Sequence, residues 1–124
     1  MTPGKPTIVI LRKPIERSEL SRLVAAHFGD MVKIVVDLRR QVVAIGGELH
    51  ADAEHLLLEQ GSQQADLWGA NYYPGRGAEG FLEYTALINI RPSQGNPAME
   101  IQDAETCEAV RSIVERLVGQ GEEL

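Results

Sequence analysis

The sequence has little of several residue types on which specialised chains depend. Its 124 residues include one cysteine, Cys107, one tryptophan, Trp68, and two phenylalanines. A single cysteine cannot form an internal disulfide and excludes a zinc site built from several cysteines. The longest apolar runs are a few residues, far below the roughly 20 that a membrane helix needs. No basic segment with a long apolar run marks a secretory signal, so we expect a cytoplasmic protein without a membrane span.

The remaining composition is that of an ordinary folded domain. Hydrophobic residues make up 44% of the chain and charged residues 24%, which are typical values for globular proteins. A chain of this size hides roughly two-thirds of its unfolded surface on folding, so its core needs no metal or disulfide support. We therefore predict one domain over residues 1–124, with flexible ends at 1–5 and 119–124.

Charge is unevenly distributed along the chain. Residues 1–40 carry eight Lys or Arg and four acidic residues, whereas residues 41–124 carry four and fourteen, for a net charge of −6. One interpretation is nucleic-acid binding through the basic third, and its candidate residues are Lys13, Arg17, Arg22, Lys33, Arg39 and Arg40. The overall acidity and the lack of interleaved aromatics argue against it. The other interpretation is that basic and acidic helices face each other and steer packing or self-association.

Hydrophobic spacing predicts alternating strands and helices. Strands are expected at 7–11, 32–38, 42–45, 67–73 and 81–91, and helices at 17–28, from about 53 to 60, and after Asp103. The alternation over 81–91 is the cleanest in the chain. Glu16 and Glu19 have the spacing of a capping box, and Asp103 can cap the last helix, where Cys107 lies on the apolar stripe. We predict a single α+β domain of order β-α-β-β-α-β-β-α, with a mainly antiparallel sheet and helices packed on one face.

A first group of polar residues lies in the segment ELHADAEH. If the chain is extended up to His50, the side chains of Glu48 and His50 share one side, next to Asp52. Such a group could transfer protons or bind a divalent cation. His50 and His55 are five residues apart, however, rather than the four of the helical zinc motif, so no metal site is predicted. Alternatively, His50 caps the following helix or bonds to a neighbouring strand.

Two further groups follow along the chain. Trp68 either packs in the core or forms a wall of a pocket, and Asn71 needs a partner in the middle of its strand. Arg91 presents a rigid fork of donors that suits a carboxylate or phosphate, or else pairs with an internal carboxylate such as Glu48. The residues after Arg91 add a hydroxyl and two amides, on Ser93, Gln94 and Asn96.

The phrases GGELHADAE, DLWGANYYP and INIRPSQGN occur in this order, together with GDMVKIVVDL. On these phrases the chain resembles an uncharacterised family of small prokaryotic proteins, a domain of unknown function. The resemblance brings no activity, and it implies only that HADAE and IRPSQGN belong to the family signature. The signature positions are His50, Asp52, Glu54, Arg91, Ser93, Gln94 and Asn96. PAMEI follows where the family implies a more basic segment, which weakens an anion-binding role for this loop.

Three functions are compatible with these patterns. The first is a non-catalytic binding or interaction module, which could be a homodimer or other homo-oligomer. The alternative is a small hydrolase or metal-dependent enzyme built on the Glu48, His50, Asp52 and Arg91 cluster. Nucleic-acid binding is the third and is not expected. No pattern identifies a cofactor or a small-molecule ligand, and convergence of His50, Asn71 and Arg91 with Glu48 in one cleft would favour a site over scaffolding.

Overall fold

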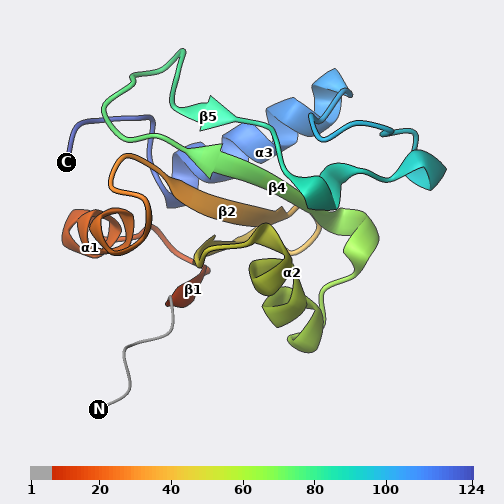
Figure 1. The fold of residues 1–124 in the computed structure, drawn as a ribbon, viewed down its shortest axis with the longest axis horizontal. Helices are drawn as coiled ribbons and strands as arrows, with labels where there is room; N and C mark the ends of the chain where they lie inside the picture. Colours follow the sequence, from red (N-terminus) through yellow and green to blue (C-terminus); the bar gives the residue numbers. More distant parts are fainter. Residues whose placement is uncertain (1–6) are drawn as a thin grey trace.

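The computed structural model describes residues 7–124, in which three helices pack against a five-stranded antiparallel sheet (Figure 1). The strands are β1 (Ile8–Leu11), β2 (Val32–Asp37), β3 (Val42–Gly46), β4 (Leu67–Tyr72) and β5 (Leu82–Glu83), in the spatial order β1-β3-β2-β4-β5. The helices are α1 (Arg17–His27), α2 (His50–Glu59) and α3 (Ala104–Leu117), with 3₁₀ turns η1 (Gln64–Asp66), η2 (Leu87–Asn89) and η3 (Pro92–Gln94). The predicted α+β class and element order are confirmed. The expected flexible segment 1–5 lies outside the described residues.

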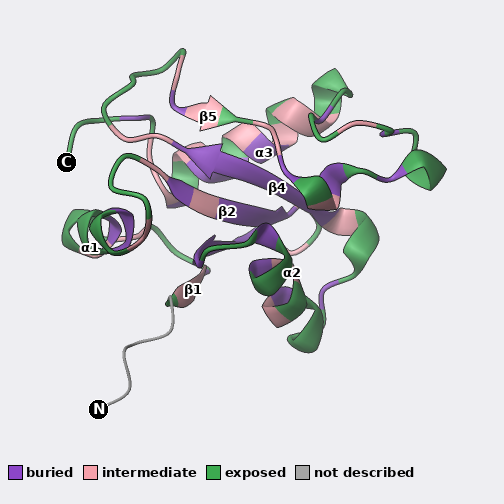
Figure 2. Cartoon of the chain, in the orientation of Figure 1, coloured by how far each residue is buried: buried purple, intermediate pink, exposed green. Residues whose placement is uncertain are grey.

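Helices cover both faces of the sheet. On β2, Ile34 and Val36 belong to the core formed with α1 and α3, whereas Val35 belongs to a separate core under α2. All three side chains are fully buried, and the central strands are buried along almost their whole length (Figure 2). The prediction that the helices share one face is therefore wrong. Because the central strands are apolar at both alternating positions, each face needs its own cover.

The helix ends agree with the sequence in part. Gly29 has a φ of +84° and donates its N–H to Val24 O, which ends α1 as predicted. The side chain of Glu16 makes no capping hydrogen bond, so the predicted capping box is wrong. The carboxylate of Asp103 accepts from the Thr106 N–H at 2.9 Å, and this confirms the predicted cap of α3.

The chain leaves the sheet soon after β5 begins. Strand β5 has two residues, and a 3₁₀ turn, η2, follows, so the predicted strand over 81–91 is wrong. The reason is Asn89, whose Oδ1 accepts from Gly69 N–H at 2.8 Å and whose Nδ2 donates to Gly69 O at 2.9 Å. This side-chain amide takes the place of a strand neighbour on β4, and the backbone around it is free to turn.

Residues 119–124, predicted as a flexible end, run beside the loop 74–81. Gly121 is buried, donates its N–H to the Tyr72 hydroxyl at 2.9 Å, and accepts from two backbone N–H groups of that loop.

Of the four ion pairs among residues 7–124, one, Arg39 with Asp66, joins the basic first third to the acidic remainder. None of the helices in this range has the length and apolar character needed to cross a membrane.

Candidate functional site

The nine predicted site residues divide into an exposed set and a buried set. Glu48, Asp52, Ser93 and Gln94 are exposed. The other five are buried, with exposed fractions of 8% for His50, 7% for Trp68, 8% for Asn71, 8% for Arg91 and 3% for Asn96. Of these, His50 and Asn71 line one open cleft, whereas Arg91 and Asn96 hold the loop that follows η2. The cluster of four residues proposed for an enzyme is thus not assembled around one cleft.

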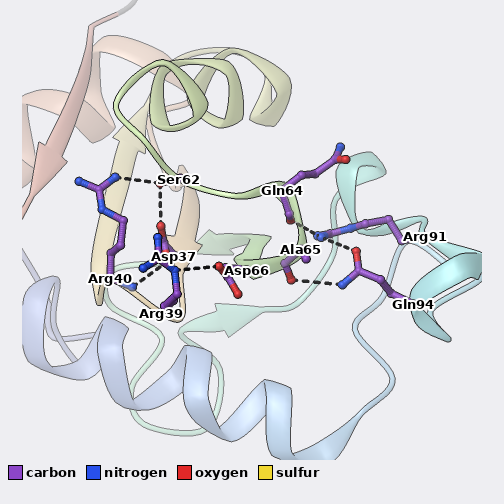
Figure 3. A network of polar contacts seen from close by, with 9 residues as sticks. All are labelled: Asp37, Arg39, Arg40, Ser62, Gln64, Ala65, Asp66, Arg91 and Gln94. Carbon is purple, nitrogen blue, oxygen red and sulfur yellow. Dashed lines mark hydrogen bonds and ion pairs between the residues drawn. The ribbon is translucent and has the colours of Figure 1, made fainter.

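Arg91 is bound by the protein's own backbone. Its guanidinium donates to Ile88 O at 3.1 Å, to Gln64 O at 2.6 Å and to Leu67 O. A further bond of 3.1 Å goes to the side chain of Gln94, which in turn donates to the backbone near η1 (Figure 3). The fork of donors is therefore used internally, by carbonyl groups rather than by the predicted carboxylate of Glu48.

The surroundings of Arg91 explain how a cation is tolerated there. The guanidinium carbon lies 4.2 Å from the centre of the Trp68 ring, a stacking contact that Lys cannot reproduce. Burial lowers the pKa of Arg91, and the negative charge of Glu54 acts in the opposite direction. Trp68 itself is part of the core formed with α1 and α3. The core interpretation of Trp68 is thus the one the packing favours.

Two buried asparagines complete this region. Besides its two bonds to Gly69, Asn89 donates to Met99 O at 3.1 Å. Asn96 donates to the carbonyls of Asn89, Ala98 and Glu100 and accepts from the N–H of Gln102. We call Asn89, Arg91 and Asn96 the loop cluster. Both side-chain amides are hydrogen-bonded within the protein through their oxygen and their nitrogen, and the guanidinium of Arg91 is hydrogen-bonded to backbone carbonyls. This indicates a structural role for the cluster.

A smaller network closes the β2–β3 hairpin. Asp37, which is fully buried, accepts from the Ser62 hydroxyl at 2.6 Å and from the Arg40 N–H at 2.9 Å. Arg39 reaches Asp66 at 3.3 Å (Figure 3). Sequence reasoning did not identify this network, although an aspartate that ends an apolar run before a polar turn is a recognisable signal for it. It fixes η1 beside the hairpin.

The open cleft has a volume of about 360 Å³ and lies between α2, β4 and the segment 85–88. Its polar side chains come from Lys33, His50, Asn71 and Thr85, and the remaining lining is apolar. We call it the His50 cleft. Its mouth is formed by side chains that are apolar and exposed, namely Leu49 at 57%, Leu87 at 70% and Met99 at 41%.

Asn71 lies in the middle of a row across three strands. In the sheet register Lys33 faces Asn71, and Asn71 faces Glu83. The Asn71 Nδ2 group donates to Glu83 Oε1 at 2.7 Å and, more weakly, to Thr85 O at 3.4 Å. The Oδ1 atom, at the other end of the amide, is buried and has no partner within residues 7–124. A buried acceptor without a donor is rare in folded proteins.

His50 is held over the same strand by a close approach. A Cβ atom at Gly69 would lie 3.2 Å from His50 Cδ2 and 2.6 Å from Ala86 Cβ, so only glycine admits both neighbours. The Nε2 of His50 bonds to Ala70 O at 2.8 Å, and because a carbonyl can only accept, Nε2 carries the hydrogen. This bond to the neighbouring strand is one of the roles that the sequence left open.

The charge state of His50 follows from its surroundings. Burial lowers the pKa of His50, and the positive charge of Lys33 lowers it further. The hydrogen bond to Ala70 O, and the hydrogen bond that a protonated ring would donate to the side chain of Asn71, raise the pKa by less, so the net direction is downward. The ring is therefore neutral near pH 7, and Nδ1 is an acceptor. We find no hydrogen-bond partner for Nδ1 in the part of the chain that the structure describes.

Lys33 is the residue that sequence reasoning counted only as part of the basic third. It is half-buried, its Nζ lies 5.3 Å from the centre of the Phe28 ring, and it forms no ion pair with another residue of 7–124. The available signal was a single lysine inside the apolar run VKIVV. The N-terminus of α2 borders the cleft beside it, and its N-cap residue, Leu49, has no side-chain acceptor to cover the free N–H groups.

Metal-ligating residues do not gather at this cleft. Across residues 7–124, no group of three or more His, Cys, Asp or Glu side chains has the geometry to hold a metal ion. His55 pairs with Glu59 at 3.4 Å on the exposed side of α2.

The chain is a small α+β domain with two polar regions. The polar groups of the loop cluster are hydrogen-bonded within the protein, whereas the His50 cleft is open. The chain belongs to a family described as a protein of unknown function (DUF5674), whose profile matches residues 9–117. This match confirms the resemblance to a domain of unknown function. No curated protein and no solved structure matches the chain.

Proposed function

We propose that the chain is a non-catalytic binding module whose ligand occupies the His50 cleft. The observation that carries this proposal is the buried Oδ1 of Asn71, which has no donor within residues 7–124. Leaving a buried acceptor unsatisfied costs about 1–3 kcal/mol. A ligand that donates a hydrogen bond in the cleft would remove this cost, and the gain would contribute directly to its affinity.

The shape and lining of the cleft support the same function. Its volume of about 360 Å³ is in the range of small-molecule sites. Exposed apolar side chains at its mouth, led by Leu87 at 70%, would be shielded from water by a bound apolar group. A specific ligand site usually combines an apolar lining with a small number of polar groups, as this cleft does.

The enzyme alternative has less support from the contacts. Glu48 and Asp52 are exposed, and Arg91, which does not line the cleft, is occupied by backbone carbonyl groups. This leaves His50 without the acidic partners and the cation that the hypothesis assigned to it. A metal-dependent reaction would also need ligands that residues 7–124 do not bring together.

Nucleic-acid binding through the basic third also has little support. Arg39 and Arg40 bind Asp66 and Ser62, and Arg22 pairs with Glu19 on its own helix. These contacts divide the positive charge among local partners. Self-association as a homodimer and a cytoplasmic location remain predictions from the sequence.

The proposal is tested by calorimetric titration with 8-anilinonaphthalene-1-sulfonate, an aromatic anion that carries one N–H donor. We expect one saturable site per chain. The variant Ala51→Phe places a ring at the cleft, where Ala51 is an exposed lining residue, and we expect it to weaken binding at least about tenfold. The matched control is Ala26→Phe on the exposed side of α1, which should bind as the wild type does. Absence of binding, or equal binding by Ala51→Phe, would show that the proposal is wrong.

A further inference from the structure

We propose that the natural ligand of the His50 cleft is a small monocarboxylic acid with an apolar ring that carries an N–H or O–H donor. This inference rests on the proposed binding function and adds the chemical class of the ligand. It assigns the carboxylate to Lys33 and the start of α2, the donor to Asn71 and His50, and the ring to the apolar walls.

The carboxylate is assigned to the end of the cleft where positive charge is not neutralised. Lys33 lines the cleft and forms no ion pair within the described part of the chain. The first turn of α2 borders the same cleft without a side-chain cap at Leu49. A helix N-terminus carries partial positive charge and free N–H groups, so the two features together favour an anion.

The donor is assigned to two acceptor atoms on residues that line the same cleft. Asn71 Oδ1 is the buried oxygen without a partner, and its position is set because Nδ2 is bound to Glu83. His50 Nδ1 is an acceptor in the neutral ring, because Nε2 donates to Ala70 O. A hydrogen bond from His50 to the side chain of Asn71 forms only when the ring is protonated, because the bond favours the charged form. Two neighbouring acceptors cannot satisfy each other, whereas one ligand N–H or O–H can bond to either or both.

The charge and size of the ligand are limited by the same residues. Glu83 follows Asn71 in the row across the strands, so a second negative charge in this part of the cleft would be repelled. This favours a monoanion over a phosphate dianion. A volume of about 360 Å³ admits a fused two-ring molecule with a short acidic arm.

Three matched probes separate these features, and each is titrated by calorimetry at pH 7. Indole-3-acetate has the ring, the donor and the carboxylate. Naphthalene-1-acetate lacks the N–H, and indole-3-acetamide lacks the negative charge. We expect indole-3-acetate to bind about five to ten times more tightly than either of the others, since each loses one hydrogen bond or charge contact in the cleft.

Two variants connect each preference to its residue. Asn71→Leu should abolish the preference for the indole over the naphthalene acid while the carboxylate preference persists. Lys33→Met should abolish the preference for the acid over the amide while the donor preference persists. Lys13→Met is the matched control, because Lys13 is exposed and lies outside the cleft. Circular dichroism checks that each variant is folded, and Asn71→Ala replaces Asn71→Leu if the latter is not.

The outcomes distinguish this inference from the proposed function. If the three probes bind equally and Ala51→Phe weakens all of them, the cleft is a binding site but the assigned ligand class is wrong. The class is also wrong if the preferences persist in Asn71→Leu and Lys33→Met. If 8-anilinonaphthalene-1-sulfonate also fails to bind, both proposals are wrong. Selective loss of one preference in each variant, with Lys13→Met unchanged, supports the assignment.

Discussion

The loop cluster and the His50 cleft contain the same kinds of polar group but satisfy them to different extents. Asn89 and Asn71 are both buried, and Asn89 bonds to Gly69 of β4, whereas Asn71 lies on β4 itself. Asn89 has partners for its oxygen and its nitrogen, whereas Asn71 has partners for its nitrogen only. Because an amide that is fully bonded within the protein has nothing to offer a ligand, the comparison supports a structural role for the loop cluster and the proposed binding role for the His50 cleft.

The largest expected effect is at Asn89. Asn89→Ala leaves the N–H and the O of Gly69 without partners in a buried position, and it removes one of the two hydrogen bonds to Met99 O. We expect the free energy of unfolding to fall by about 3 kcal/mol or more. Urea denaturation followed by the fluorescence of Trp68, the only tryptophan in the chain, measures this change. The control Ser93→Ala, at an exposed position of the same loop, should change stability by less than about 0.5 kcal/mol. A loss below about 1 kcal/mol at Asn89 would contradict the structural role of the loop cluster.

Arg91→Lys should have the next largest effect. Lysine keeps the charge but loses the fork of donors to Gln64 and Leu67 and the stacking on Trp68, so we expect a loss of about 2 kcal/mol. The emission of Trp68 should also shift as the ring loses its cover. Arg76→Lys is the matched control, because Arg76 stacks on Tyr73 but is exposed, and it should cost less than about 0.5 kcal/mol. Equal losses at the two arginines would mean that burial of Arg91 contributes nothing.

The sequence predicted which segments form helices and strands better than it predicted the contacts that surround them. The end of α1 at Gly29 and the cap at Asp103 depend on local chemistry, so the sequence was sufficient for them. The predicted strand over 81–91 was wrong because alternating apolar and polar residues do not require a continuous strand. Apolar side chains can pack against the edge of a sheet even where the backbone turns away from it. What decides between these possibilities is the pairing of Asn89 with Gly69, which lies far away in the sequence.

The residues of the candidate site, like the fold, were predicted from the sequence only in part. His50 and Asn71 were identified because polar side chains stand there among apolar neighbours. Arg91 was grouped with them because its chemistry suits an anion, and the sequence does not show that backbone carbonyls reach it first. Lys33 was missed because its role depends on the register that places it opposite Asn71.

A smaller effect is expected from the protonation of His50. Burial lowers the pKa of His50 below its unfolded value of about 6.5, so the unfolded chain binds more protons between the two values. The free energy of unfolding should therefore fall as the pH is lowered through 6.5 and should level off below the folded pKa. Because carboxylates also titrate at low pH, the quantity to compare is the difference between wild type and His50→Gln. Gln can still donate to Ala70 O but does not titrate. An identical pH dependence in the two proteins would show that His50 is as easily protonated in the fold as in the unfolded chain.

The smallest effect on stability is expected at Asn71, where the substitution is chemically the same as at Asn89. Asn71→Ala removes the bond to Glu83, which contributes about 1 kcal/mol, but it also removes a buried oxygen that has no partner within residues 7–124. These contributions oppose each other, so the free energy of unfolding should stay within about 1 kcal/mol of the wild-type value, as measured by the same urea titration. A loss as large as that of Asn89→Ala would mean that Oδ1 is satisfied in the folded protein. The difference between the two regions would then disappear, because the cleft would be a closed structural cluster like the loop that Asn89 holds.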